Sequence, residues 1–203
     1  LLPALFHNDP RAFIALMQGR CARTIGRYAE ALERFERARA GHGAKSVFEA
    51  VVRLHEAQCW LELGVHDRAT HAIQEALNEQ MPPRYRAPAL VVKARIARAL
   101  RQRGDATIDE AVRIVPRGGW YELQFLVGIE AAQFAAPEAA LDQLVAIVKR
   151  SQAMGFHGMA LAARLRACDI AATADPARAA RLARQALLSG THVEAESLPR
   201  VER

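Results

Sequence analysis

The residues whose types and spacing first suggest chemistry are His55, Glu56 and Cys59, which lie within the segment His55-Glu56-Ala57-Gln58-Cys59. Residues four positions apart fall on one face of a helix, and two histidines with this spacing bind zinc in helical metalloprotease motifs. Here cysteine replaces the second histidine, and no third ligand is apparent. Glu56 and Cys59 also fit a repeating helical pattern, so we expect core packing at this segment and no metal site.

A second candidate is the segment Gly41-His42-Gly43-Ala44-Lys45-Ser46, which is similar to a phosphate-binding loop. An extra residue separates the glycine from Lys45-Ser46, and a helix is expected before the loop where that motif needs a strand. We therefore interpret the segment as a linker between helical units. No serine, histidine and aspartate set, close acid pair or glycine fingerprint is found, so we expect no catalytic residue, no cofactor and a binding protein rather than an enzyme.

The composition indicates which elements must position any functional residue. Alanine occurs 42 times among 203 residues, against three tyrosines and two tryptophans. Because alanine loses no side-chain entropy in a helix, this excess predicts closely packed helices and an all-α fold. No stretch has the roughly 20 apolar residues needed to cross a bilayer, and the start, Leu1-Leu2-Pro3, lacks the features of a signal peptide. We expect no membrane partner.

The charge is positive and is carried mainly by arginine. The net charge is +6, with 25 arginines against only Lys45, Lys93 and Lys149. Arginine forms planar, bidentate contacts with carboxylates, which suggests an acidic partner, although a GC-rich coding sequence would also produce the arginine and alanine excess. Cys21, Cys59 and Cys168 are far apart and lie in helical patterns. They are interpreted as small core residues of a protein in the reducing cytoplasm.

A repeating pattern of small and aromatic residues is clearest between residues 12 and 45. Gly19 and Ala22 precede the turn at Gly26, Tyr28 follows it, and Ala31, Phe35 and Ala38 continue at helical spacing. This pattern resembles the tetratricopeptide repeat, a pair of helices whose small residues allow close approach. A second copy places Ala57, Trp60, Gly64, Ala69, Ile73 and Ala76 at the matching positions.

The resemblance extends, more weakly, over most of the chain. Turn residues align at Gly26, Gly64, Gly104, Ala135 and Ala174, at spacings of 38, 40, 31 and 39 residues, against about 34 in the family. We expect one repeat domain over residues 1–203 with about five helix pairs, at 12–45, 48–83, 88–116, 119–155 and 157–190. The missing initial methionine and the absence of a polar capping helix at the end suggest a piece of a longer protein.

The resemblance implies a right-handed α–α superhelix with an inner groove lined by the first helix of each pair. By analogy with the family, the partner-binding residues are expected at Phe13, Leu16, Arg20, Arg23, Leu54, Gln58, Leu61, Arg98, Arg101, Phe125 and Arg164. The arginines among them would hold carboxylates of an extended or helical peptide. The alternative interpretation is a solvated helix surface whose arginines form ion pairs with acids of adjacent helices.

Three functions are compatible with these residues. The first is a protein–protein interaction module, because the repeats are similar in style to the C-terminal arrays of bacterial transcriptional regulators of the maltose and antibiotic types. The second is a sensor that binds a small-molecule effector inside the superhelix. The third, nucleic-acid binding, is disfavoured because acids at Glu30, Glu33 and Glu36 interrupt the basic residues. Association into a homodimer through uncapped ends is also expected.

Overall fold

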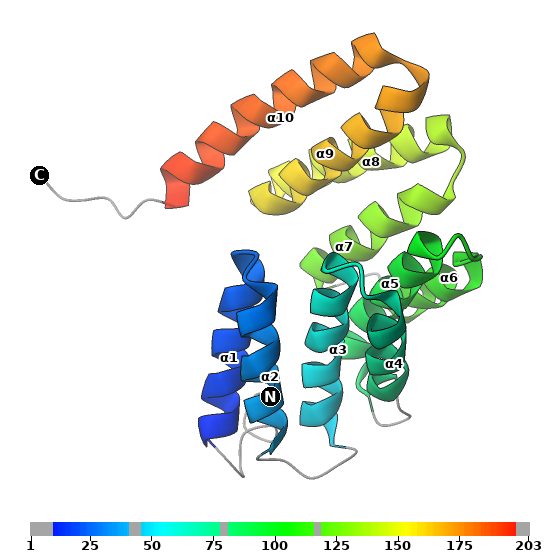
Figure 1. The fold of residues 1–203 in the computed structure, drawn as a ribbon. Helices are drawn as coiled ribbons and strands as arrows, with labels where there is room; N and C mark the ends of the chain where they lie inside the picture. Colours follow the sequence, from blue (N-terminus) through cyan, green and yellow to red (C-terminus); the bar gives the residue numbers. More distant parts are fainter. Residues whose placement is uncertain (1–9, 41–45, 78–80, 116–118, 198–203) are drawn as a thin grey trace, which may run out of the picture. The chain divides into compact units, whose positions relative to one another are not determined.

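Residues 10–40, 46–77, 81–115 and 119–197 are described by the computed structural model, and all their regular elements are helical (Figure 1). They form ten α-helices and one short 3-10 helix, which confirms the expected all-α class. Helices that follow one another in the chain pack together as tetratricopeptide-like pairs. None of the described helices combines the length and the apolar character that crossing a membrane requires.

The chain divides into two compact units, residues 1–114 (unit 1) and 115–203 (unit 2). Unit 1 contains three helix pairs. Their bounds are α1 Pro10–Thr24, α2 Tyr28–Ala40, α3 Val47–Glu62, α4 His66–Ala76, α5 Pro83–Ala99 and α6 Asp105–Ile114. The third pair therefore begins at Pro83, five residues before the expected start at 88. Of the segment that resembles a phosphate-binding loop, residues 41–45 lie outside the described residues, and Ser46 caps α3 by accepting a hydrogen bond from the Glu49 amide.

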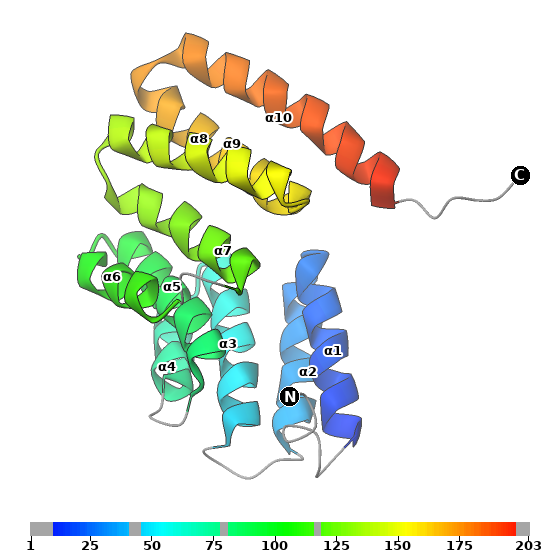
Figure 2. The same cartoon turned by 180° about the vertical axis from the view of Figure 1, so that it is seen from behind.

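Unit 2 contains the remaining helices. They are α7 Tyr121–Ala131, the 3-10 helix η2 Ala132–Phe134, α8 Pro137–Ala153, α9 His157–Ala174 and α10 Pro176–Ser197. Proline stands in the first turn of α8 and of α10, where its missing amide hydrogen costs no helical hydrogen bond. α8 packs closely on α9, and α9 on α10. Figure 2 shows the same helices from behind.

The turns that end α1, α3, α5 and α8 share one hydrogen-bonding pattern. At α1, the Gly26 amide donates to the Arg23 carbonyl and the Arg27 amide donates to the Ala22 carbonyl, which is the Schellman arrangement. Its central residue needs a positive φ, and Gly26, Gly64 and Gly155 supply it. At α5 the same place is taken by Arg101, with φ of 57°.

This turn corrects the alignment of the third repeat. Gly104, which was aligned with Gly26 and Gly64, instead directly precedes α6, and its carbonyl accepts hydrogen bonds from the Thr107 and Ile108 amides. The equivalent of Gly64 is Arg101, so the left-handed turn residues lie 38 and then 37 positions apart in unit 1. The alignment failed because glycine was used as the marker of a conformation that arginine adopts here.

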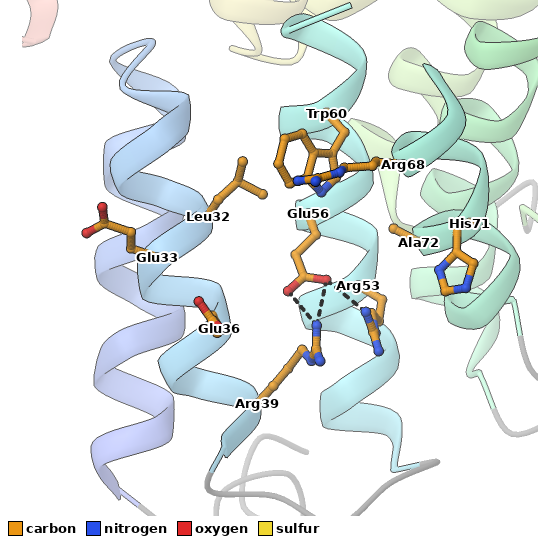
Figure 3. Close-up of a pocket in the computed structure, with 10 residues that line it drawn as sticks. All are labelled: Leu32, Glu33, Glu36, Arg39, Arg53, Glu56, Trp60, Arg68, His71 and Ala72. Atoms are coloured by element: carbon orange, nitrogen blue, oxygen red, sulfur yellow. Dashed lines mark hydrogen bonds and ion pairs between the residues drawn. The ribbon is translucent and has the colours of Figure 1, made fainter. Parts of the chain in front are cut away.

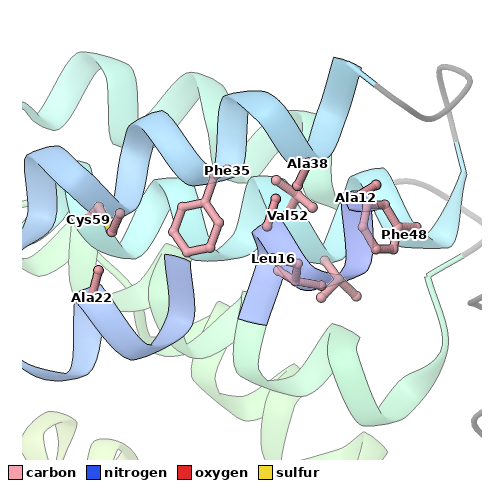
Figure 4. Packing of buried hydrophobic residues seen from close by; sticks show 11 residues of the cluster. Ala12, Leu16, Ala22, Phe35, Ala38, Phe48, Val52 and Cys59 are labelled. Atoms are coloured by element: carbon pink, nitrogen blue, oxygen red, sulfur yellow. The ribbon is translucent and has the colours of Figure 1, made fainter. Parts of the chain in front are cut away.

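The first core cluster explains why Gly19 matters. Phe35 of α2 is fully buried, and a Cβ atom added at Gly19 would lie 2.5 Å from its ring. The glycine therefore lets the phenylalanine ring lie directly against the backbone of α1. Figure 4 shows this ring among Leu16, Ala22 and Val52, so that α1, α2 and α3 share one core. This contact explains why the sequence has a small residue at position 19 and an aromatic residue at position 35.

Alanine fills the other cores. The second cluster of unit 1 joins α3, α4 and α5 around Ile73, and the cluster of unit 2 joins α7, α8, α9 and α10 around Leu144. In both clusters more than half of the buried residues are alanines, such as Ala57, Ala69 and Ala163. Because a methyl group occupies little space, the helix backbones approach closely and leave few gaps.

Candidate functional site

The first candidate site lies on the surface of unit 1 that α1, α3 and α5 share, which we call the first-helix face. α3 contacts α1 on one side and α5 on the other, and Figure 1 and Figure 2 both place α3 between α2 and α5. Of the predicted binding residues, Arg20 and Arg23 belong to α1, Gln58 and Leu61 to α3, and Arg98 to α5. The structure places these five on adjacent helices of one unit.

Three other predicted residues are core residues. Leu16 is 5% exposed, Leu54 is 3% exposed and Phe125 is 2% exposed. The Phe125 ring also packs edge-on against Phe156, with ring centroids 5.6 Å apart. These side chains offer almost no surface to a partner, so we leave them out of the candidate site.

The remaining predicted residues have different surroundings. Phe13 is half-buried on α1, and Arg164 is half-buried on α9, a helix of unit 2. Arg101 is exposed and lies in the turn after α5. Its position follows from the Schellman turn and needs no binding role to explain it.

Arg23 is the most unusual charge on the first-helix face. Burial lowers the pKa of its guanidinium, the nearby Arg20 lowers it further, and the side chains of Cys59, Tyr28 and Glu62 oppose these effects. The Arg23 Nε atom is buried without a hydrogen-bond partner among the described residues, and no described carboxylate forms an ion pair with Arg23. Arg23 is therefore a partly desolvated cation that forms no direct ion pair with a carboxylate of the described residues, although the charge of Glu62 acts on it.

His55 lies beside this cation. Its ring stacks on Phe35 with centroids 5.7 Å apart, and burial lowers its pKa to about 4, so the imidazole is neutral at pH 7. The Nδ1 atom lies 3.0 Å from Gln58 Oε1. Because the amide oxygen can only accept, Nδ1 carries the ring proton and donates, which leaves Nε2 as an acceptor.

The two candidate metal ligands of the sequence, His55 and Cys59, both lie on α3. No group of three or more histidine, cysteine, aspartate or glutamate side chains comes together as a metal cluster in the described ranges of the chain. Cys59 is fully buried, and burial raises the pKa of its thiol to about 11, so it stays protonated at neutral pH. A protonated thiol is a poor metal ligand and a poor nucleophile.

A shallow cavity of about 300 Å³ opens beside the ends of α3 and α5. The Arg95 guanidinium forms an ion pair with Glu62 across it, at 2.9 Å. The Nδ1 atom of His66 is buried without a hydrogen-bond partner among the described residues. The lining residues are Leu61, Glu62, His66, Arg95, Arg98 and Ala99, so two predicted residues, Leu61 and Arg98, meet here.

A second cavity, of about 450 Å³, lies between α2, α3 and α4, and sequence analysis missed it (Figure 3). Its lining residues are Leu32, Glu33, Glu36, Arg39, Arg53, Glu56, Trp60, Arg68, His71 and Ala72. The α3 residues that line it, Arg53, Glu56 and Trp60, are about half a turn of helix away from His55, Gln58 and Glu62. In the sequence, the i, i+3 spacing of Glu33 and Glu36 was the available sign of this cavity, but these residues form only its α2 wall.

Buried ion pairs form the floor of this second cavity. Both oxygens of Glu56 accept hydrogen bonds from Arg39, at 3.1 and 3.3 Å, and Arg53 lies 3.4 Å from one of them. Burial raises the pKa of the Glu56 carboxyl, against the opposing effect of the two arginines. Arg53 also pairs with Glu75 at 3.0 Å, so α2, α3 and α4 are joined by one network of charges.

Comparison with known proteins yields a likeness of fold only. No protein-family model matches the chain, and no curated protein matches it. A solved structure described as YrrB, a TPR protein with an unusual peptide-binding site, is 15% identical over 96% of each chain, with a TM-score of 0.46. A likeness this distant carries no information about the residues of either cavity.

Proposed function

We propose that unit 1 is a peptide-binding module that holds an acidic segment of a partner protein on the first-helix face. The observation that carries this proposal is Arg23, whose guanidinium is half-buried and forms no ion pair with a described carboxylate. Burying a charge without a counterion is unfavourable, and a carboxylate from a partner would relieve that cost.

The charges around Arg23 support a negatively charged partner. Arg20 lies one turn before it and forms no ion pair with a described carboxylate, and Arg95 and Arg98 face the same surface from α5. The first cavity has one acidic lining residue, Glu62, and its carboxylate is already paired with Arg95. The face thus has an excess of positive charge, which attracts an acidic peptide and repels a basic one.

The neutral groups on α3 support recognition of a peptide backbone. The Nε2 atom of neutral His55 can accept a hydrogen bond, and Gln58 beside it carries an amide donor. Such groups pair with the N–H and C=O groups of an extended chain, while the arginines pair with acidic side chains. The face thus combines sequence-independent contacts with charge selection.

The test is a titration of the full chain with a short alanine-based peptide that carries glutamates, followed by calorimetry or anisotropy. We expect Arg20→Gln with Arg23→Gln to weaken binding about ten-fold, because two charge-assisted contacts are lost. The matched control is Arg181→Gln with Arg184→Gln, which changes two exposed arginines at the same i, i+3 spacing on α10. Equal affinities for the two double variants would contradict the proposal.

The proposed wider role is that of a regulatory repeat region in a larger bacterial transcriptional regulator. It is supported by the style of the repeats in the sequence and stays a prediction. The complete open reading frame tests it, because the role requires a DNA-binding domain encoded in the same gene. A reading frame that encodes helical repeats alone would contradict it.

A further inference from the structure

The cavity between α2, α3 and α4 has a floor whose charges are matched and a rim whose charges are not. In the floor, Glu56 is paired with Arg39 and Arg53. On the rim, Glu33 and Glu36 of α2 are exposed and form no ion pair with a described residue. Both residues line the cavity, and because the Glu33 carboxylate points away from α3 in Figure 3, it must rotate to reach a ligand there.

Across the cavity from α2, the aromatic ring of Trp60 is already in contact with a cation, the Arg68 guanidinium. The guanidinium carbon of Arg68 lies 4.7 Å from the centroid of the Trp60 ring, and Figure 3 shows the two side chains overlapping above Glu56. Arg68 is exposed and forms no ion pair with a described carboxylate. Its contact with Trp60 is therefore a cation–π interaction at an exposed site, which is weak and easily exchanged.

We propose that this cavity binds the side chain of an arginine or lysine in a peptide segment of a partner protein. In the unbound chain, Arg68 occupies the ring of Trp60 in place of that side chain. The incoming cation would stack on the indole and pair with Glu33 and Glu36, which satisfies both unmatched carboxylates. Arg68 would swing out into solvent, at little cost because it is exposed.

The charges of the cavity select against an anion. Glu33, Glu36 and Glu56 would all repel an incoming carboxylate, while Arg39 and Arg53 are engaged in the floor. Arg68 alone would attract it. The cavity volume of about 450 Å³ is within the usual range for ligand sites and is ample for one long side chain.

The experiment follows the fluorescence of Trp60 in the full chain. The chain has two tryptophans, so Trp120→Phe leaves Trp60 as the single indole. The probes are an acetylated and amidated alanine peptide with one central arginine and the same peptide with a central glutamate. We expect the arginine peptide to change the Trp60 emission in a saturable way, and the glutamate peptide to leave it unchanged.

The proposal predicts the direction in which substitution of Arg68 changes the affinity for the arginine peptide. If Arg68 competes for the ring, Arg68→Ala should bind the arginine peptide about two- to five-fold more tightly, as expected for removing an exposed cation–π contact. Unchanged or weaker binding by Arg68→Ala would overturn the proposal. Saturable binding of the glutamate peptide that is lost in Arg68→Ala would also overturn it and would indicate an anion site.

The carboxylates are tested with their isosteric amides. Glu33→Gln with Glu36→Gln should weaken binding of the arginine peptide about five-fold, because the contribution of two exposed ion pairs is lost. The matched control, Glu122→Gln with Asp142→Asn, removes two exposed acids of unit 2. Equal affinity in the two double variants would overturn the proposal. Arg20→Gln with Arg23→Gln should leave this binding unchanged, which separates it from the acidic-peptide site.

Discussion

At the scale of single residues, the contact between Gly19 and Phe35 determines how closely α1 and α2 pack. The Phe35 ring is fully buried and lies where a side chain at position 19 would be. Because the ring is enclosed by α1, α2 and α3, it cannot move away without disturbing the first core cluster. Gly19 is therefore required by packing, since it lies inside a helix where its backbone freedom is a disadvantage.

We predict that Gly19→Ala destabilises the chain by about 1–3 kcal/mol, the usual cost of overpacking a core. The added Cβ would meet the Phe35 ring at 2.5 Å. Urea unfolding followed by circular dichroism measures the effect. Gly158→Ala is the matched control, because a Cβ at that exposed helical glycine meets nothing within 4 Å. A variant at position 19 as stable as the control would refute this packing role.

The second prediction at this scale concerns His55 and pH. Its pKa is about 4 in the folded chain, against 6.5 for an unperturbed histidine, because burial disfavours the charged ring. The unfolded chain thus binds a proton more readily between these pH values. The contribution to stability is complete above about pH 6.5 and is lost as the pH falls toward about 4, at a cost of about 3 kcal/mol.

The measurement is the free energy of unfolding from pH 7.5 to pH 4, compared between the original chain and His55→Gln. The glutamine variant should lose less stability over this range, because it has no ring to protonate. His71→Gln removes an exposed histidine, 72% accessible at its side chain, and should behave as the original chain does. Identical pH profiles for all three proteins would show that His55 is not the group responsible.

At the scale of elements, the Schellman turns define the repeat better than residue identity does. Four helices end in the same pair of hydrogen bonds, and three of these turns use glycine. The fourth uses Arg101, whose backbone adopts a conformation that is unfavourable for residues with a Cβ. The cost is local, since the pattern of hydrogen bonds is unchanged.

We predict that Arg101→Gly stabilises the chain by about 0.5–1 kcal/mol, because glycine adopts a positive φ without strain. Thermal or urea unfolding measures the gain. Gly64→Ala provides the reverse comparison: its φ is 72° and nothing lies near its Cβ, so only backbone strain changes. That variant should lose a similar amount. Destabilisation by Arg101→Gly would mean that the arginine side chain makes contacts that outweigh the strain.

α3 also shows how one element serves two surfaces. His55 stacks on Phe35 of α2 and lies beside Gln58, whereas Arg53, Glu56 and Trp60 line the cavity between α2, α3 and α4. The two sets are separated by about half a turn of the helix. A substitution on one surface can therefore be tested for effects on the other, because both depend on the same backbone.

At the scale of the whole molecule, the division into two units allows unit 1 to be tested by itself. Both cavities and all residues of the first-helix face lie in unit 1, residues 1–114. Unit 1 has two core clusters of its own, which join α1 to α5. We therefore expect it to contain what it needs for folding and for peptide binding.

The prediction is that residues 1–114 expressed alone remain helical, unfold cooperatively and bind the acidic peptide within about two-fold of the affinity of the full chain. A two-fold difference corresponds to about 0.4 kcal/mol, which is small against the lost contacts of a binding residue. Circular dichroism and the same calorimetric titration provide the measurements. A fragment that is helical but fails to bind would show that unit 2 contributes to the site.

The sequence by itself determined the helices and the marks of the repeat. The alanine excess indicated an all-α fold, and Gly19, Ala22 and Phe35 indicated close pairing of the first two helices, because these features depend on local propensity and on small residues at helical spacing. Gly26 and Gly64 likewise marked turns whose conformation glycine favours. The resemblance to the repeat family implied first-helix positions for Arg20, Arg23, Gln58, Leu61 and Arg98, which lie on α1, α3 and α5.

Only the tertiary structure decided which of those positions are accessible. Leu16 and Leu54 are core residues because a helix inside a stack is covered on more than one side, and the extent of that cover depends on its neighbours. The cavity beside Trp60 combines side chains from three helices, so no single stretch of sequence contains it. Periodicity assigns a residue to a face of its helix, whereas burial and charge pairing arise only when the helices meet.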